Sequence, residues 1–357
     1  MGSILLMMGL LAAVASARAA PLPPDPPVGT VTLEFTVPSR DRKVASELWF
    51  EAAPASATEE LTVRPPLRAI TLARNAQPAV STRKRALVVI SHGNWGTRFS
   101  QGWLALSLVR AGYVVLSTSH PGTLGDDQTA AGRLRLWDRA RDVSLALDEL
   151  LRHPRWAGLI DESRIGFVGH SFGGWTGVSL AGGRYDTKRQ RAFCASARTK
   201  DVYCEASLKD EIAGVDTSDG GDSFKDERIK AFYIMASGPA PGFTEDSLLR
   251  IAAPFVVETA KLDEVLEADA NSGRLARLIP GAIEVVRPVG HFAYVPECKP
   301  YIGALLARAA GTPICDDPRG VDRAAVHVEV AERVLRHFKL HLAVNLASGS
   351  SKLKGPD

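Results

Sequence analysis

One short stretch, residues 164–174, constrains the fold of this chain more than any other. It reads Arg-Ile-Gly-Phe-Val-Gly-His-Ser-Phe-Gly-Gly, and a helix-like pattern follows it from Trp175 to Leu180. A serine inside G-x-S-x-G, between a strand and a helix, sits in a strained turn that lifts its hydroxyl above a sheet. Gly169 and Gly173 would let neighbouring backbone pass close by, and the helix N-terminus would favour developing negative charge. Ser171 is therefore a candidate nucleophile.

The segments around this stretch alternate between strand-like and helix-like patterns. The expected strands are residues 30–37, 47–51, 67–73, 86–91, 113–117, the run before Ser171, 229–236, 253–258 and 283–286. The expected helices are residues 104–111, 134–151, the segment after Ser171 and 321–342. Such alternation with right-handed crossovers gives a mostly parallel sheet with helices on both faces. Together with antiparallel N-terminal strands, the pattern predicts an α/β fold with the α/β-hydrolase architecture.

The ends of the chain differ in composition from its middle. Residues 1–19 resemble a signal peptide, because the apolar run from Ile4 to Ala15 precedes small residues in an A-x-A pattern, although no Lys or Arg precedes the run. The alternative is a disordered or membrane-tethering N-terminus. We expect a Pro-rich linker at 20–29, one hydrolase domain at 30–345 with a polar insertion at 185–228, and a disordered tail at 346–357. The apolar run is too short for a stable membrane span, so the sequence predicts a periplasmic or secreted protein.

The overall composition is that of an ordinary globular protein. Hydrophobic residues make up 45% and charged residues 23% of the chain, and the formal net charge is +3. The basic residues are scattered rather than clustered, so nothing indicates a nucleic-acid partner.

Four cysteines form two local pairs, Cys194 with Cys204 and Cys298 with Cys315. Neither pair has the C-x-x-C spacing of zinc or thioredoxin-like sites. In an oxidising compartment we expect each pair to form a disulfide, although four cysteines allow three connectivities and four free thiols remain the alternative.

A serine nucleophile needs a base and an acid, which in this architecture follow it in the order Ser, Asp or Glu, His. His291 comes directly after the last expected strand, whereas His327, His337 and His341 lie in the closing helix. His337 and His341 are four residues apart, but Phe338 stands where a zinc protease has its glutamate, so they read as helix-face residues and no metal is expected. We therefore expect His291 to be the base.

The acid is expected after the strand that ends at Glu258. Asp263 is the first choice, and Glu264 and Glu258 are its competitors. Two backbone donors would bind the oxyanion, the amide of Phe172 and the amide of Asn94 in the loop after the first parallel strand. The alternative for that loop is a tight turn only.

Four of these short motifs together resemble those of a known group of hydrolases. Ser-His-Gly-Asn at 91–94, Ser-His-Pro-Gly at 119–122, Gly-His-Ser-Phe-Gly-Gly at 169–174 and Gly-His-Phe at 290–292 look like the exported bacterial proteins called predicted dienelactone hydrolases, which are similar to plasma-type platelet-activating-factor acetylhydrolases. The resemblance covers roughly residues 30–340 and implies a calcium-independent serine esterase, without a cofactor, for small-molecule or lipid esters with short or oxidised acyl chains.

Two departures limit this resemblance. True dienelactone hydrolases use a cysteine where Ser171 stands, so the resemblance does not imply that this protein acts on their substrate. The acetylhydrolases place their acid one strand earlier, where this chain has Ala-Ser-Gly at 236–238.

We expect the substrate pocket to form from the loop after Ser119 and from the 185–228 insertion, with Trp95, His120 and His170 as lining candidates. The function favoured by the sequence is an exported carboxylic-ester hydrolase. The alternatives are a peptidase or amidase with the same triad, and a binding protein on a hydrolase scaffold.

Overall fold

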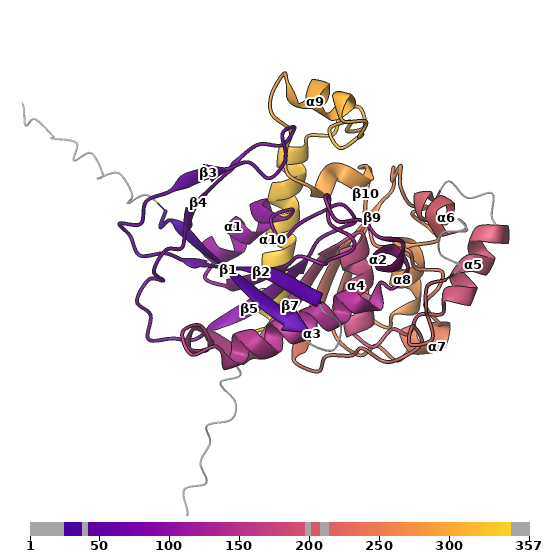
Figure 1. The fold of residues 1–357 in the computed structure, drawn as a ribbon, viewed down its shortest axis with the longest axis horizontal. Helices are drawn as coiled ribbons and strands as arrows, with labels where there is room; N and C mark the ends of the chain where they lie inside the picture. The colour runs from indigo at the N-terminus through magenta and orange to yellow at the C-terminus, as the bar shows by residue number, and fades with distance from the viewer. Residues whose placement is uncertain (1–24, 38–41, 197–200, 208–213, 344–357) are drawn as a thin grey trace, which may run out of the picture.

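The structure, a computed structural model, describes residues 25–37, 42–196, 201–207 and 214–343 (Figure 1). The expected signal peptide at 1–19 and the expected tail at 346–357 lie outside the described residues, as do parts of the linker and of the 185–228 insertion.

A ten-stranded sheet runs through the molecule in the order β10-β9-β8-β7-β5-β6-β2-β1-β4-β3. Its strands are β1 (Val28–Val37), β2 (Arg42–Glu51), β3 (Glu59–Leu61), β4 (Ile70–Arg74), β5 (Arg85–Ser91), β6 (Val114–Thr118), β7 (Ile160–His170), β8 (Ile229–Met235), β9 (Phe255–Ala260) and β10 (Ile283–Arg287). Strands β5 to β10 pair in parallel, whereas β2 pairs antiparallel with both β1 and β6. The predicted fold class, a mostly parallel sheet with antiparallel strands at the N-terminus, is confirmed.

Helices cover both faces of this sheet. They are α1 (Gly102–Arg110), α2 (Ala130–Leu134), α3 (Trp137–Arg152), α4 (Phe172–Leu180), α5 (Thr187–Ser196), α6 (Val202–Ser207), α7 (Glu245–Leu248), α8 (Ser272–Leu278), α9 (Gly303–Ala309) and α10 (Arg323–His341), with 3-10 helices η2 (Ala157–Leu159) and η4 (His291–Tyr294). The helix expected at 134–151 is present as α3, but it starts later, at Trp137, because the backbone leaves the helical region at Arg135 after the short helix α2. The short strand β3 was not expected, because its polar residues carry no apolar alternation.

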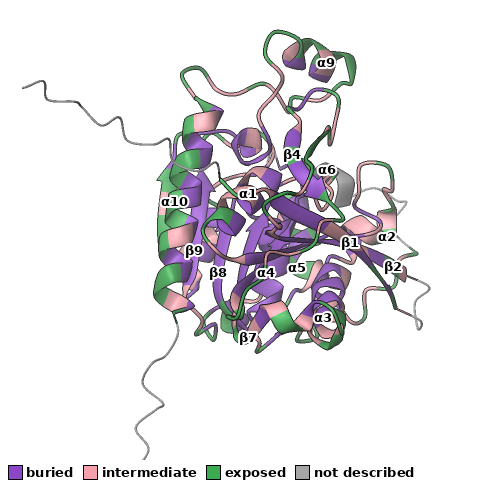
Figure 2. Ribbon diagram, turned by 90° about the vertical axis from the view of Figure 1, so that its left-hand side faces the viewer, coloured by how far each residue is buried: buried purple, intermediate pink, exposed green. Residues whose placement is uncertain are grey.

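The sheet divides the core into two apolar layers, and the side chains of β5 pack into both of them. Leu87 and Val89 belong to the layer that includes α3 and α4. Val88 and Ile90 point the other way, into the layer that includes α1 and α10. A strand buried on both faces must be apolar at every position, which explains the uninterrupted apolar run of β5. Figure 2 shows these buried strands between helices whose outer faces are exposed.

Two segments extend from this frame. The 185–228 insertion carries α5 and α6, and a lobe around α9 stands out from the body of the molecule in both views (Figures 1 and 2). Within the described residues, no helix combines the length and the apolar character that crossing a bilayer requires.

Candidate active site

Ser171 occupies the sharp turn between β7 and α4. Its φ of 57° is rare for a residue with a side chain, and its amide is held by the carbonyl of Met235 on the neighbouring strand β8. A Cβ on Gly169 would collide with the backbone of Gly173, and a Cβ on Gly173 would collide with the carbonyl of Ser91. Both glycines are therefore required by close backbone approach, as the sequence predicts.

Two further side chains approach Ser171 from the ends of β9 and β10. His291 opens η4 just after β10, and its Nε2 lies 3.0 Å from the Ser171 hydroxyl. Asp263 lies in the turn after β9, and its Oδ2 is 2.7 Å from His291 Nδ1. The side chains of His291 and Asp263 are almost completely buried. The structure thus brings the three residues singled out in the sequence into one hydrogen-bonded chain.

The two competing carboxylates occupy different places. Glu264 accepts a hydrogen bond of 2.9 Å from the backbone amide of His291, so it holds the loop rather than the imidazole. Glu258 is fully buried in β9, where it accepts hydrogen bonds from Arg287 and Tyr233 on the strands beside it. Of the three acids, only Asp263 has a hydrogen bond to the imidazole of His291.

The electrostatics around His291 favour its protonated form. Burial acts to lower the pKa of His291, but the charge and hydrogen bond of Asp263 oppose it, and the pKa ends above its usual value of 6.5. The neighbouring His170 shifts in the opposite direction, because burial, together with the charge of His291, lowers the pKa of His170 to about 3. His170 is therefore neutral around pH 7, and its Nε2 lies 3.0 Å from the His291 carbonyl oxygen. His170 thus steadies the backbone of the loop that carries His291.

The segment expected to form the oxyanion site faces Ser171 from the end of β5. The amides of Trp95 and Gly96 are used by the carbonyls of Thr123 and Gly93, whereas no backbone partner for the Asn94 amide is found among the described residues. Phe172 is the first residue of α4, and its amide is one of the donors that a helix start leaves without an intrahelical acceptor. Both expected donors are therefore available.

A buried arginine beneath this loop was not foreseen. Arg139 of α3 donates to the His92 carbonyl in the loop, to Thr123 at 2.6 Å and to Thr176 of α4 at 3.1 Å. One guanidinium therefore fastens the Asn94 loop to the helix that follows Ser171. Its position on the buried face of α3 could have suggested this role, since an unpaired arginine is rarely placed in a core.

His120 does not line the pocket, contrary to the prediction from the sequence. It has no exposed surface, and its ring is held between Ser91 (2.9 Å) and Asp142 (3.0 Å). Asp142 also receives two hydrogen bonds of 2.7 Å from Arg42 of β2. His120 is thus part of the polar support under the site.

A cavity of about 60 Å³ opens beside Ser171. Its lining residues are Val63, Arg64, Leu67, Gly93, Asn94, Trp95, Gly96, Ser100, Gln101, His170, Ser171, His291, Phe292, Val295, Pro296 and Ile314. Trp95 and His170 are present as expected, although 54% of the Trp95 surface is exposed. The expectation that the pocket forms from the loop after Ser119 and from the 185–228 insertion is wrong for the described residues, since none from either segment lines the cavity. Its walls come instead from residues 63–67, 93–101 and 292–314.

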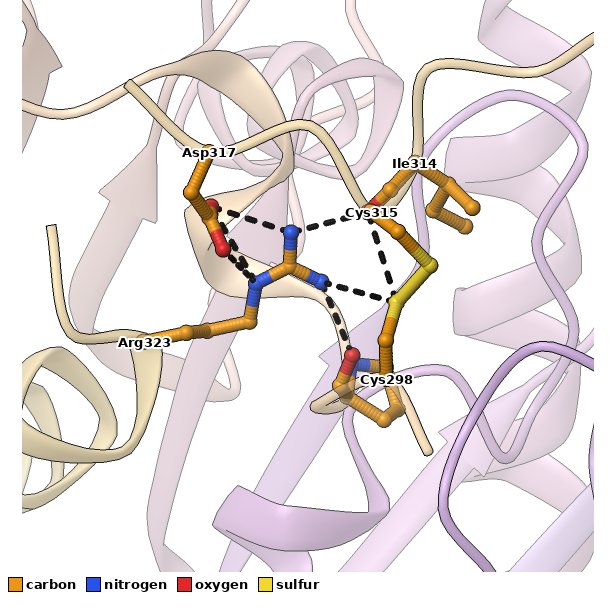
Figure 3. Close-up of a disulfide and its surroundings, with 6 residues drawn as sticks. Cys298, Ile314, Cys315, Asp317 and Arg323 are labelled. Atoms are coloured by element: carbon orange, nitrogen blue, oxygen red, sulfur yellow. Dashed lines mark hydrogen bonds and ion pairs between the residues drawn. A yellow bond between two sulfur atoms is a disulfide. The ribbon is translucent and has the colours of Figure 1, made fainter. Parts of the chain in front are cut away.

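The disulfide Cys298–Cys315 fastens one of these walls (Figure 3). Pro296 lies two residues before Cys298, and Ile314 lies directly before Cys315. Arg323 donates to the carbonyls of Pro296 and Ile314, at 3.0 and 2.8 Å. The second expected pair, Cys194 and Cys204, also forms a disulfide, in the insertion. Both predicted pairings are present in the structure.

Breaking Cys298–Cys315 should lower activity before the fold unfolds. A disulfide closing a loop of this size contributes roughly 3 kcal/mol in the chain-entropy model, and its loss frees the wall that carries Pro296 and Ile314. The double variant Cys298→Ser/Cys315→Ser should show raised KM at temperatures where its circular dichroism is still native. If its activity fell only in step with the loss of native signal, the bridge would have no separate role at the site.

The histidines of the closing helix lie apart from this chemistry. His327 stacks on Trp103, with ring centroids 3.9 Å apart, and its Nε2 lies 3.0 Å from the Val295 carbonyl oxygen behind the cavity wall. The rings of His337 and His341 are 4.8 Å apart, and no third metal-ligating side chain joins them within the described residues.

Comparisons with known proteins agree with this architecture. Residues 87–341 match the model of the alpha/beta hydrolase family. Over 103 residues the chain is 34% identical to Cutinase 2 of Thermobifida cellulosilytica and to Cutinase cut1 of Thermobifida fusca, a match that spans 28% of this chain and 36% and 30% of those proteins. The chain therefore spans about a third of the length of the curated relatives it matches.

Among solved structures, the ferulic acid esterase from Streptomyces cinnamoneus has a TM-score of 0.58 and 19% identity, with 95% of this chain and 96% of that chain covered. This likeness shows a shared fold. Because the family model covers well over half of its residues, the chain belongs to the alpha/beta hydrolase family.

Proposed function

We propose that this protein is a serine-dependent carboxylic-ester hydrolase that works through an acyl-enzyme. The observation that carries the proposal is the hydrogen-bonded chain from the Ser171 hydroxyl through His291 to Asp263. The partial match to two proteins named cutinases supports an ester rather than an amide as the bond that is cleaved.

In the first half of the reaction, Ser171 attacks the ester carbonyl while His291 Nε2 accepts the hydroxyl proton. Asp263 holds the imidazole by Nδ1 and stabilises the imidazolium that forms. The amides of Phe172 and Asn94 bind the oxygen that becomes negative, and losing one such donor costs about 3–4 kcal/mol in the transition state. The tetrahedral intermediate collapses, and His291 gives its proton to the departing alcohol.

In the second half, water attacks the acyl group on Ser171. His291 accepts a proton from that water, and the acid product leaves as the Ser171 hydroxyl is restored. The cavity beside Ser171 is small, which fits the short or oxidised acyl chains that the resemblance to platelet-activating-factor acetylhydrolases implies. That resemblance, like export by the N-terminal segment, remains a proposal.

Two measurements on the purified protein test the reaction class. 4-Nitrophenyl acetate should give a burst of one equivalent of nitrophenol, and a fluorophosphonate probe should label Ser171. A series of 4-nitrophenyl esters with rising acyl length would then report the acyl preference. Absence of labelling would favour a binding protein, and labelling with turnover of amides but not esters would favour a peptidase.

The pH dependence of kcat/KM should report His291. The base must be neutral to accept a proton, so activity should fall on the acid side with a midpoint above 6.5, the usual value, because Asp263 keeps the pKa of His291 raised. Protonated His291 forms an ion pair with Asp263, and this pair stabilises the fold below the unfolded-state pKa of the histidine. The stabilisation is lost as pH rises through the folded-state pKa of His291, which is the same range in which activity should appear. Initial rates with a neutral ester measure the midpoint, and a value below 6.5 would contradict this account.

A further inference from the structure

Arg64 stands apart from the other residues that line the cavity beside Ser171. Apart from the two histidines, the described residues of the lining are apolar or carry uncharged polar groups, and among them Arg64 alone has a permanent charge. None of these described lining residues is a carboxylate. Asp263 and Glu264 are turned toward the ring and the backbone of His291. The cavity that would receive the ester is therefore positively charged on one wall.

Most of the hydrogen-bonding capacity of Arg64 is unused. Its guanidinium has five N–H donors, and one of them is engaged by the carbonyl of Trp95. Within the described residues, Arg64 has no other hydrogen bond and no carboxylate within 4 Å. Asp126 in the loop opposite is exposed and acts on Arg64 only at longer range. A half-buried guanidinium with spare donors is suited to an oxyacid group brought by a ligand.

The segment that carries Arg64 is held firmly at the cavity edge. Leu67 forms a β-bridge with Cys298, the amide of Arg68 donates to the Glu297 carbonyl at 2.8 Å, and the amide of Lys299 donates to the Pro66 carbonyl at 2.8 Å. The disulfide Cys298–Cys315 closes the other side of this contact. Arg64 is thus presented by a fastened loop, and its donors need little further ordering to meet a ligand.

We propose that Arg64 selects esters that carry a second, negatively charged oxyacid group, a carboxylate or a phosphate, on either the acyl or the alcohol portion. The inference rests on the proposed esterase function and names its substrate class. Arg64 would bind the anionic group while Ser171 attacks the ester carbonyl in the same cavity. A charge-assisted, bidentate hydrogen bond of this kind favours the anionic ester over its neutral counterpart by about tenfold or more in kcat/KM.

The test compares matched anionic and neutral esters on the full chain. On the acyl side the pair is mono-4-nitrophenyl succinate and 4-nitrophenyl butyrate, and on the alcohol side the pair is 4-carboxyphenyl butyrate and phenyl butyrate. A third arm uses 4-phosphophenyl butyrate, in which a phosphate group takes the place of the carboxylate group. The wild-type protein should prefer the anionic member of at least one pair, and the arm that shows the preference identifies the position and kind of the anionic group.

Arg64→Gln should lower that preference ratio by about tenfold, mainly through KM, and Arg64→Lys should retain part of it. Arg68→Gln is the matched control, because Arg68 lies four residues away on the same segment, outside the cavity lining, and should leave the ratio as it is. The inference is overturned if the wild type shows no preference in any arm. It is also overturned if Arg64→Gln lowers both members of a pair alike, since that marks a structural role through Trp95.

These results separate the inference from the function on which it rests. Turnover of neutral esters without an anionic preference removes the role of Arg64 and leaves the esterase standing. If the wild type hydrolyses none of the esters, the proposed function itself is wrong.

Discussion

Ser171→Ala should reduce ester hydrolysis by about 10⁶ in kcat while the protein stays folded, because the acyl-enzyme cannot form without the hydroxyl. The backbone of the turn does not depend on that hydroxyl. The amide of residue 171 bonds to the Met235 carbonyl and its own carbonyl accepts from Trp175, and alanine can make both bonds. Alanine meets the same cost as serine at a φ of 57°, so the strain in the turn is unchanged.

The measurement is a comparison of burst size, steady-state rate and melting temperature between the variant and the wild type. Fluorophosphonate labelling should disappear together with the burst, and the melting temperature should change little. A variant that kept even a hundredth of the wild-type rate with native stability would show that another residue is the nucleophile.

The arrangement of the sheet could be predicted because it depends on local patterns. The apolar run of β5 and the glycines around Ser171 are set by burial and close backbone contact within a few residues. The order Ser171, Asp263, His291 could be read along the chain, since each residue follows a parallel strand and such strand ends meet at one edge of the sheet. The distances among the three then follow from the strand order β7-β8-β9-β10.

The cavity walls could not be predicted, because they depend on contacts between distant segments. Residues 63–67 have no clear periodicity, and their place beside Ser171 comes from the bridge between Leu67 and Cys298, more than two hundred residues apart. His120 failed as a pocket residue for a related reason. A polar residue in a loop is expected at the surface, but here the buried Asp142 and Ser91 supply partners for the His120 ring that make full burial tolerable. Asp142 comes from α3, and its polar side chain gives no sign in the sequence that it is buried.

Asp263→Asn should lower kcat by about 10⁴ in an otherwise intact protein, because the structure forces the new amide to face the wrong way. Oδ1 of Asp263 accepts hydrogen bonds from the amides of Val265 and Leu266, at 2.8 and 2.7 Å, while Oδ2 meets His291 Nδ1. An asparagine must keep its oxygen toward the two amides, so its NH₂ group points at Nδ1. That contact requires Nδ1 to be unprotonated, which places the remaining proton on Nε2, where it blocks acceptance of the Ser171 proton.

Glu264→Gln is the matched control. Among the described residues, the one hydrogen-bond donor to the Glu264 carboxylate is the His291 amide, and a glutamine oxygen can accept that bond. We expect it to lower kcat by less than about tenfold, the effect of weakening one charge-assisted hydrogen bond to the loop. The two variants also differ in the acid limb of kcat/KM. Removing the Asp263 charge takes away the main influence that raises the pKa of His291, so burial should then move any residual midpoint below that of the wild type. If Glu264→Gln were the more damaging change, Glu264 rather than Asp263 would be the acid that orients His291.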